Sequence, residues 1–394
     1  MTSPVRNFLA PMRARSADEP HRVSTPLELF FDLCFVVAVA QAALPLHHSI
    51  AEHHVGHGLY GYLTVFFAIW WAWMNFTWFA SAYDTDDDVY RITTLVQIAG
   101  ALVLAAGVES AFERTDFLVI TIGYVVMRLA LVSQWLRAAR SDPQRRPTAY
   151  RYAIGVTVVQ VLWLLRLLIP HDSPWITPAF VALALLELAV PVWAEAAPGG
   201  PTTYHPHHIT ERYGLFTIIV LGEAVLSATV AFQSALNEGD GTDQTELIML
   251  AVSGIVIVFA LWWTYFDRSA HNLITRLRTS LMWGYGHYFI FAAAAAVGAG
   301  IGVNVDYVTH HAEISRTVAA YAIAVPVAVY LFFVWLLHIR PHQRGLLLAT
   351  YPAGVVCCLL TPLVPGSIAV LAVLLVVLVA VNSAGARRVP DPIG

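Results

Sequence analysis

Long apolar segments alternate with short polar loops along the whole chain, and this pattern restricts the fold more than any other feature. Twelve segments are about 18 to 24 residues long, as an α-helix needs to cross a hydrocarbon core about 30 Å thick. Lipid offers the backbone no hydrogen bonds, so these segments must be helices. The composition, 58% hydrophobic and 12% charged, excludes a soluble globule. We predict an all-α membrane protein with twelve transmembrane segments, 26–46, 58–80, 91–110, 116–136, 151–170, 175–194, 211–233, 246–267, 281–302, 316–338, 345–361 and 365–382.

Arginine marks one side of the predicted membrane. All 22 basic residues are arginines. Only Arg114 and Arg316 fall in loops of one side, and Arg128 and Arg166 lie inside segments. Cytoplasmic loops collect positive charge, so the asymmetry predicts a multi-pass protein of the bacterial cytoplasmic (inner) membrane with both termini in the cytoplasm. The arginines on the predicted cytoplasmic side are Arg6, Arg13, Arg15, Arg22, Arg91, Arg137, Arg140, Arg145, Arg146, Arg151, Arg212, Arg268, Arg276, Arg278, Arg340, Arg344, Arg387 and Arg388.

A short motif occurs twice in the chain. Phe67-Ala68-Ile69-Trp70-Trp71 in the second segment corresponds to Phe259-Ala260-Leu261-Trp262-Trp263 in the eighth. Six crossings separate the copies, so both halves begin on the same side of the membrane, which is the arrangement of parallel repeats. The predicted organisation is an Arg-rich cytoplasmic arm at 1–24, a six-helix repeat at 25–195, a His- and Pro-rich cytoplasmic linker at 196–210, a second six-helix repeat at 211–382 and a cytoplasmic tail at 383–394.

The first segment carries two carboxylates on one helix face. Glu28 and Asp32 are four residues apart, a spacing that places both side chains on the same side of a helix. Thr25, Pro26 and Glu28 match the start of a helix with a capping box, so capping alone explains Glu28. Asp32 lies one turn deeper, where a carboxylate needs a partner or water. We therefore expect Asp32 to make a buried polar contact or to line a pathway.

Four further ionisable residues lie deep inside segments: Arg128, Glu187, Glu223 and His287. Charges near the membrane midplane normally face the bundle interior and pair. The structural interpretation is one ion pair between Arg128 and either Glu187 or Glu223. One acid then remains unless Arg166 or a proton neutralises it, and a leftover carboxyl is what a proton- or cation-coupled carrier requires. The candidate residues of the pathway or polar core are Asp32, Glu223, Glu28, Arg128, Glu187, His287, Asn75 and Asp267.

Histidines gather in two places. The first outer loop holds five of them, and His205, His207 and His208 precede the seventh segment. Neutral imidazole binds zinc or copper, so the trio is a candidate metal site. The alternative is adventitious binding, because His-rich stretches often bind metal without a dedicated site.

Three stretches resemble signatures of the bacterial low-temperature-requirement protein A family. Glu28–Gln41 resembles its opening helix, His207–Phe216 with Leu221–Ala224 its second signature, and Ala260–Asp267 a third. The resemblance covers roughly residues 22–380. It implies a polytopic inner-membrane protein linked in name to growth in the cold, and it implies no substrate.

The leading functional hypothesis is a transporter or channel-like pathway for a small solute or ion, with proton coupling as one form of it. A membrane-embedded metal- or lipid-dependent enzyme that uses the inner histidines and carboxylates is the second hypothesis. A structural or sensory membrane protein is the third. The expected partners are the lipid bilayer and a small solute or ion. Nucleic-acid binding has no support, because the arginines follow the loop pattern that topology requires.

Overall fold

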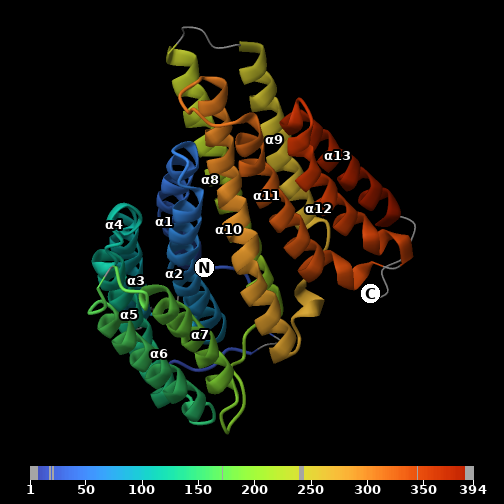
Figure 1. The fold of residues 1–394 in the computed structure, drawn as a ribbon. Coiled ribbons are helices and arrows are strands. Elements are labelled where there is room, and N and C mark those ends of the chain that lie inside the picture. Colours follow the sequence, from blue (N-terminus) through green and yellow to red (C-terminus); the bar gives the residue numbers. More distant parts are fainter. Residues whose placement is uncertain are drawn as a thin grey trace. The chain divides into compact units, whose positions relative to one another are not determined.

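The computed structural model describes residues 8–386 except 17–18, 20–21, 171, 239–243 and 344, and every element in this part of the chain is a helix (Figure 1). Arg6, Arg344, Arg387 and Arg388, as well as the last eight residues of the predicted tail, lie outside the described residues. The α-helices are α1 (Pro26–Ala51), α2 (Val55–Tyr83), α3 (Asp88–Ala106), α4 (Val108–Arg114), α5 (Leu118–Ser141), α6 (Arg146–Arg166), α7 (Ile176–Glu195), α8 (Pro206–Glu238), α9 (Gln244–Phe266), α10 (Leu277–Val308), α11 (Arg316–Val334), α12 (Thr350–Leu360) and α13 (Ser367–Ala386).

The helices confirm a multi-pass membrane protein. Among the described residues, 11 helical spans are long and apolar enough to cross a membrane. The third of them, Asp88–Arg114, combines α3 and α4. A shorter apolar helix, Leu347–Leu363, occupies the predicted eleventh segment. Its α-helical part, α12, has only 11 residues and is continued by 3₁₀ turns at both ends. The twelve predicted segments thus correspond to eleven long helical spans and one short one.

The chain divides into two compact units. Unit 1 comprises Met1–Gln41 and Phe67–Tyr213, and unit 2 comprises Ala42–Phe66 and Gly214–Gly394. The boundaries fall inside α1, α2 and α8. These units differ from the predicted repeats, because residues 42–66 of the first repeat belong to unit 2. The internal duplication itself stays a prediction.

In unit 1, successive helices pack against one another: α3 against α5, α5 against α6 and α6 against α7. Glycines let α3 and α5 approach closely. A Cβ atom added at Gly123 would lie 2.5 Å from the carbonyl oxygen of Gly100, so no larger residue fits there. Asp87 caps α3 by accepting a hydrogen bond from the Tyr90 backbone N–H at 2.8 Å, a typical N-cap interaction.

In unit 2, α10 packs mainly against α11, while α9 packs against α13 and α11 against α12. The central part of α10 is buried over Ile290–Val305, a stretch of mostly Ala, Gly and Val. Small residues permit close contact between membrane helices. Asn304 reaches across this contact and donates to the Ala319 carbonyl of α11 at 2.6 Å. Ser315 caps α11 through the Val318 backbone N–H.

Candidate functional site

The start of α8 lies earlier than the sequence pattern indicated. The helix begins at Pro206 rather than near residue 211. His208 and Arg212 are therefore one turn apart on a single helix face. We counted Arg212 among the arginines that flank the segments on the predicted cytoplasmic side, but it lies in α8 and its side chain is fully buried. The interpretation as an ordinary flanking charge was wrong, because an arginine near a segment end looks like a loop charge.

Arg212 forms a two-pronged ion pair with Asp32. Its Nε donates to Asp32 Oδ2 at 2.8 Å and its Nη2 donates to Asp32 Oδ1 at 2.6 Å. Trp73 Nε1 also donates to Asp32 Oδ1 at 2.6 Å. The two parallel bonds match the planar guanidinium to the carboxylate, the strongest geometry for such a pair. Asp32 thus has the buried polar partner expected for it, and the partner is Arg212.

Glu28 serves two structures with its two oxygens. Oε2 accepts from the Thr25 backbone N–H at 2.7 Å, and Thr25 Oγ1 accepts from the Glu28 N–H at 3.3 Å. This is the predicted capping box at the start of α1, and it is confirmed. The other oxygen, Oε1, lies 3.2 Å from Arg212 Nη1. His208 Nε2 contacts both oxygens, at 3.2 Å from Oε1 and at a hydrogen-bond distance of 3.3 Å from Oε2. Capping alone is therefore an incomplete account of Glu28.

Arg22 connects Glu28 to a third acid, Asp84. Its Nη2 lies 3.6 Å from Glu28 Oε1 and 3.7 Å from Asp84 Oδ2, and it donates to the Ala80 carbonyl at 3.2 Å. Asp84 directly follows α2. Burial, together with the nearby negative charge of Glu28, raises the pKa of Asp84 to about 6.

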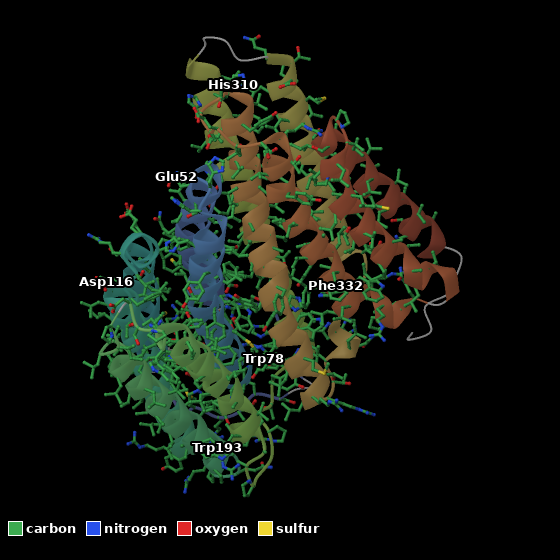
Figure 2. All side chains as sticks on the ribbon, in the orientation of Figure 1. Glu52, Trp78, Asp116, Trp193, His310 and Phe332 are labelled. Atoms are coloured by element: carbon green, nitrogen blue, oxygen red, sulfur yellow. The ribbon has the colours of Figure 1, made fainter. Side chains whose placement is uncertain are left out.

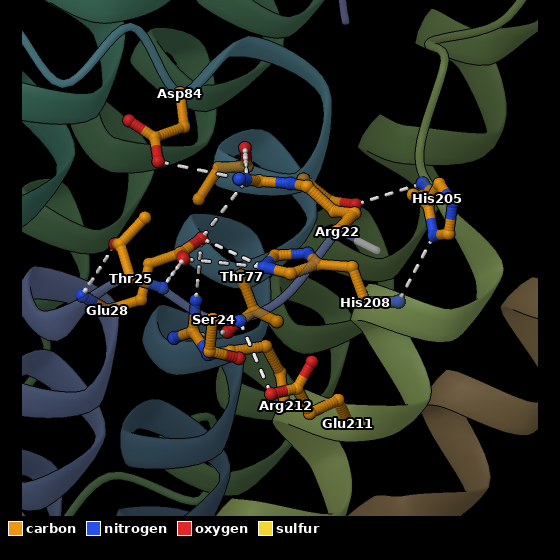
Figure 3. A network of polar contacts seen from close by, with 12 residues as sticks. Arg22, Ser24, Thr25, Glu28, Thr77, Asp84, His205, His208, Glu211 and Arg212 are labelled. Carbon is orange, nitrogen blue, oxygen red and sulfur yellow. Dashed lines mark hydrogen bonds and ion pairs between the residues drawn. The ribbon is translucent and has the colours of Figure 1, made fainter. Parts of the chain in front are cut away.

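These six residues form one continuous set of buried ionisable side chains in unit 1, which we call the Arg212 network; Figure 3 labels all of them except Asp32. The figure shows contributions from the chain before α1, from the starts of α1 and α8, and from the end of α2. The sequence singled out Glu28 and Asp32 for this role but missed Arg22, Asp84 and Arg212. Two spacings were informative: Arg22 lies six residues before Glu28, and Arg212 lies four residues after His208. The members are Arg22, Glu28, Asp32, Asp84, His208 and Arg212.

A second buried ion pair lies elsewhere in unit 1. Arg128 Nη2 is 3.2 Å from Glu187 Oε2, so the predicted pairing of Arg128 with a midplane acid is found, and Glu187 is the partner. Glu187 also accepts hydrogen bonds from Trp71 at 2.8 Å, Tyr124 at 3.0 Å and Trp163 at 3.2 Å. We call these five residues the Glu187 cluster. Both of its carboxylate oxygens have two donors each.

The remaining candidates are not members of these two groups. Glu223 is in unit 2, where its Oε1 accepts from Ser227 at 3.0 Å. Asn75 donates to the Trp71 carbonyl of its own helix at 2.7 Å. Asp267 is 3.4 Å from Arg268. Their predicted role in a pathway stays a prediction.

The three inner histidines have different surroundings. His205 Nε2 donates to the Glu19 carbonyl at 3.0 Å, and its Nδ1 accepts from the His208 backbone N–H at 3.3 Å, so both ring nitrogens are engaged. Burial lowers the pKa of His205. His208 faces Glu28, and His207 is exposed. Among the described residues, no three His, Cys, Asp or Glu side chains lie together as metal ligands. Metal binding by this trio stays a prediction.

Unit 2 contains an apolar cavity of about 360 Å³ between the end of α1, the start of α2, α10 and α11. Its walls include Leu46, Leu59, Phe289 and Val325. The end of unit 2 where α1 and α10 terminate is polar, and Figure 2 labels Glu52 and His310 there. Near this end His47 Nε2 lies 2.6 Å from Asp306 Oδ2.

Comparisons with known proteins agree with this architecture. A protein of Rhizobium meliloti (strain 1021), described as uncharacterized, is 27% identical over 289 residues, which cover 70% of this chain and 68% of that protein. The family model of the bacterial low temperature requirement A protein matches residues 23–384. This match spans every transmembrane helix and includes all the residues of both buried charge groups except Arg22. The chain is a member of the bacterial low temperature requirement A (LtrA) family.

Proposed function

We propose that this protein is a transporter or permeation pathway for a small solute or ion, and that proton exchange in the Arg212 network is coupled to the flux. The proposal places the protein in the bacterial inner membrane with both termini in the cytoplasm and with parallel six-helix repeats. The observation that carries it is the charge imbalance of the network.

The network contains more acid than permanent base. Three buried carboxylates, Glu28, Asp32 and Asp84, face two arginines, Arg22 and Arg212. An uncompensated buried charge is expensive, so the network favours an additional positive charge. The part-buried Arg15, which pairs with Glu19, acts on Asp84 and Glu28 from outside the network. A proton on Asp84 or on His208 would neutralise the network itself. Ionisable groups buried in membrane proteins commonly mark proton relays and ion pathways.

Several atoms of the network retain hydrogen-bonding capacity. Glu28 Oε1, Asp84 Oδ2, Arg22 Nε, Arg212 Nη1 and His208 Nδ1 are buried and have no hydrogen-bond partner within the described residues. Leaving a buried polar atom unsatisfied costs about 1 to 3 kcal/mol. A water molecule, an ion or a polar solute bound among these atoms would recover that energy. The network therefore offers both donors and acceptors to a small polar ligand.

Asp84 is the best placed of the three acids to exchange a proton. Its pKa of about 6 lies close to neutral pH, and it lies just beyond the end of α2. A group with a pKa near the working pH changes protonation with little energetic cost. We assign the exchangeable proton to Asp84. The two arginines hold the other two acids, Glu28 and Asp32, in position.

Proteoliposomes test this function directly. The purified protein is reconstituted with a trapped pH-sensitive dye, a potassium diffusion potential is imposed with valinomycin, and proton entry is recorded alone and with a panel of amino acids, sugars and inorganic ions. Asp84→Asn keeps the shape of the side chain but removes its titration, so it should abolish proton coupling in a folded protein. Glu211→Gln is the matched control, because Glu211 accepts only a 3.3 Å bond from the Ser24 N–H at the edge of the network.

The outcomes separate the three functional hypotheses. Proton entry that depends on Asp84 supports the proposal. Wild-type vesicles that remain as tight as empty ones with every solute would contradict it and favour a structural or sensory protein. Turnover of a lipid or a metal-dependent substrate without flux would favour an enzyme.

Membrane orientation needs its own measurement. Reporter fusions after residues 50, 145, 240 and 390 should indicate outside, inside, outside and inside, as the arginine distribution predicts. An inside signal after residue 50 or 240 would overturn the orientation and the parallel repeats together.

A further inference from the structure

The apolar cavity of unit 2 is a groove built from one face of each of three helices. Val55, Leu59 and Tyr62 of α2 line it, and their spacing places them on one face of that helix. The lining residues of α10, between 289 and 296, and of α11, between 318 and 329, follow the same kind of spacing. The end of α1 closes one side. The groove therefore runs along the helices.

The floor of the groove consists of small side chains and its rim of large ones. Ala293, Ala296 and Ala322 line the groove and are buried. At the rim, Leu59 is 48% exposed and Val325 is 43% exposed. The alanines leave space that longer side chains would fill, and the exposed rim opens that space sideways, toward the hydrocarbon of the membrane.

The polar groups near the groove are already engaged. The Tyr62 hydroxyl donates to the Ala292 carbonyl at 2.6 Å. His287 of α10 is buried and is not part of the lining, and its Nδ1 donates to the Trp283 carbonyl at 2.7 Å. The predicted pathway role of His287 stays a prediction. The walls thus present hydrocarbon to whatever lies in the groove.

The length of the groove matches one leaflet of a membrane. Eleven residues of α11 separate Val318 from Val329, which is about 16 Å at 1.5 Å per residue. A hydrocarbon core is about 30 Å thick, so each leaflet contributes about 15 Å. Val318 lies in the first turn of α11, and Val55 is the first residue of α2. The groove therefore begins where these helices begin and extends one leaflet deep.

The width of the groove suits a hydrocarbon chain. A volume of about 360 Å³ spread over about 16 Å gives a mean cross-section of about 20 Å². An α-helix is about 10 to 12 Å across, so a helix of a second copy is too wide. Water is a poor occupant, because apolar cavities stay dry. An empty groove would lose dispersion contacts along its walls.

The mouth of the groove carries both carboxylates and imidazoles. The loop between α1 and α2 holds Glu52, His53 and His54, which are all exposed, and Figure 2 labels Glu52 there. Glu52 lies 4.0 Å from His54. His53 Nε2 donates to the carbonyl of Glu313 at 3.0 Å, which brings the loop before α11 to the same place. Carboxylates attract an ammonium group, and imidazole N–H groups donate to phosphate. The mouth therefore complements a headgroup that carries both charges.

We propose that this groove binds one acyl chain of a phospholipid whose headgroup, with a phosphate and an ammonium group, lies at the mouth. The walls surround the chain with dispersion contacts that a lipid on a flat helix face lacks. This lipid is therefore retained longer than its neighbours around the protein. The site lies within unit 2 and is independent of the Arg212 network and of any transport function.

Photoreactive lipids test the groove in the full-length protein. The protein is reconstituted in phosphatidylglycerol nanodiscs that contain a trace of phosphatidylethanolamine with a diazirine at the end of one acyl chain, and labelled peptides are identified after illumination. We expect label at the deep end of the groove, around Phe289 and Val329, well above the label on the exposed face of α13. A photoreactive fatty acid has the chain without the headgroup and should label both places alike. Equal labelling of the two places by the phospholipid would overturn the proposal, as would preferential labelling of the groove by the fatty acid.

Variants locate the chain and the headgroup. Ala296→Phe fills the floor and should reduce labelling of the groove to the level of α13, while Val373→Phe, which adds bulk at an exposed position of α13, should leave it unchanged. Glu52→Gln/Glu313→Gln should abolish the preference for the phospholipid over the fatty acid. Undiminished labelling in folded Ala296→Phe would contradict the site. If that variant does not fold, Ala322→Leu on the α11 wall gives the same test with a smaller increase in volume.

Discussion

The Glu187 cluster and the Arg212 network are both buried inside unit 1, yet they handle charge in opposite ways. The cluster has one acid and one arginine, and each oxygen of Glu187 accepts two hydrogen bonds. The network has three acids for two arginines and leaves Glu28 Oε1 and Asp84 Oδ2 without a hydrogen-bond donor.

This difference distinguishes a buried ion pair that serves structure from a group of buried charges that can serve function. A balanced and saturated carboxylate gains nothing by taking up a proton, so the Glu187 carboxylate fixes helices in place, although Nε and Nη1 of Arg128 have no hydrogen-bond partner among the described residues. The Arg212 network has one more acid than arginine, so its excess is one negative charge. Binding or losing a single proton is therefore enough to switch the network between a neutral and a negatively charged state. Substitutions in the two groups distinguish these two behaviours.

Arg212→Met should have the largest effect. It removes the partner of both Asp32 and Glu28, and breaking a single buried pair already costs about 3 to 5 kcal/mol in soluble proteins. The folded, monodisperse yield in detergent should therefore collapse. Adding Asp32→Asn should restore part of the yield and not all of it, because Glu28 remains uncompensated. Full recovery in that double variant would show that Arg212 serves Asp32 alone.

Arg128→Met should cost about 3 to 5 kcal/mol through a single orphaned acid. Here Arg128→Met/Glu187→Gln should recover part of the melting temperature, because it removes the orphaned charge and the single carbonyl oxygen of glutamine can still accept from Tyr124 and Trp163, which share Oε1 of Glu187. Arg128→Met/Glu223→Gln is the matched control and should recover nothing. Rescue by the Glu223 change would contradict the pairing and erase the contrast with the network.

Asp84→Asn should change how stability depends on pH. The pKa of Asp84 is raised from 3.8 to about 6 in the folded protein, so its contribution to stability is fully present below pH 4 and is lost as the pH rises through 6. The variant should melt like the wild type near pH 4 and be more stable above pH 7, by about 1 to 3 kcal/mol. Melting curves between pH 4 and 8 measure this. Asp172→Asn, a change at an exposed acid, should leave the profile unaltered, and a wild-type profile in Asp84→Asn would place the titrating group elsewhere.

Glu211→Gln should have the smallest effect. Glu211 lies on the first turns of α8 and accepts a long bond from the Ser24 N–H at 3.3 Å, which glutamine can also accept. The loss is limited to an interaction with the helix dipole of about 0.3 to 1 kcal/mol. If the melting temperature falls as far as in Arg128→Met, Glu211 must be counted as a fourth acid of the Arg212 network, and the excess of negative charge is larger.

Local features of the sequence were sufficient for the helices and their caps. Apolar length predicted every transmembrane segment, although α12 is shorter than its segment because 3₁₀ turns flank it. Thr25, Pro26 and Glu28 predicted the capping box that begins α1. Such features depend on residues a few positions apart, so one sequence contains all the information they need.

The buried charges were harder to predict, because partners come from distant segments. The positions of the charges in the sequence left two possible partners for Arg128, Glu187 and Glu223. Only the packing of the helices selects Glu187. Arg212 was misassigned since its place near a segment end fits the topology rule equally well. Asp32 is 180 positions away from Arg212, and no spacing rule connects them.

Because Glu28 both caps α1 and belongs to the Arg212 network, the first turn of α1 is coupled to the charge of that network. One oxygen holds the first turn of α1 through the Thr25 N–H, while the other lies against Arg22 and Arg212, and His208 contacts both oxygens. A ligand or proton that draws Glu28 toward new partners must also loosen that turn, and rewinding the turn must draw the carboxylate back. Fraying at the start of α1, visible as faster hydrogen exchange of its first amides, is thus a direct readout of what the network has bound.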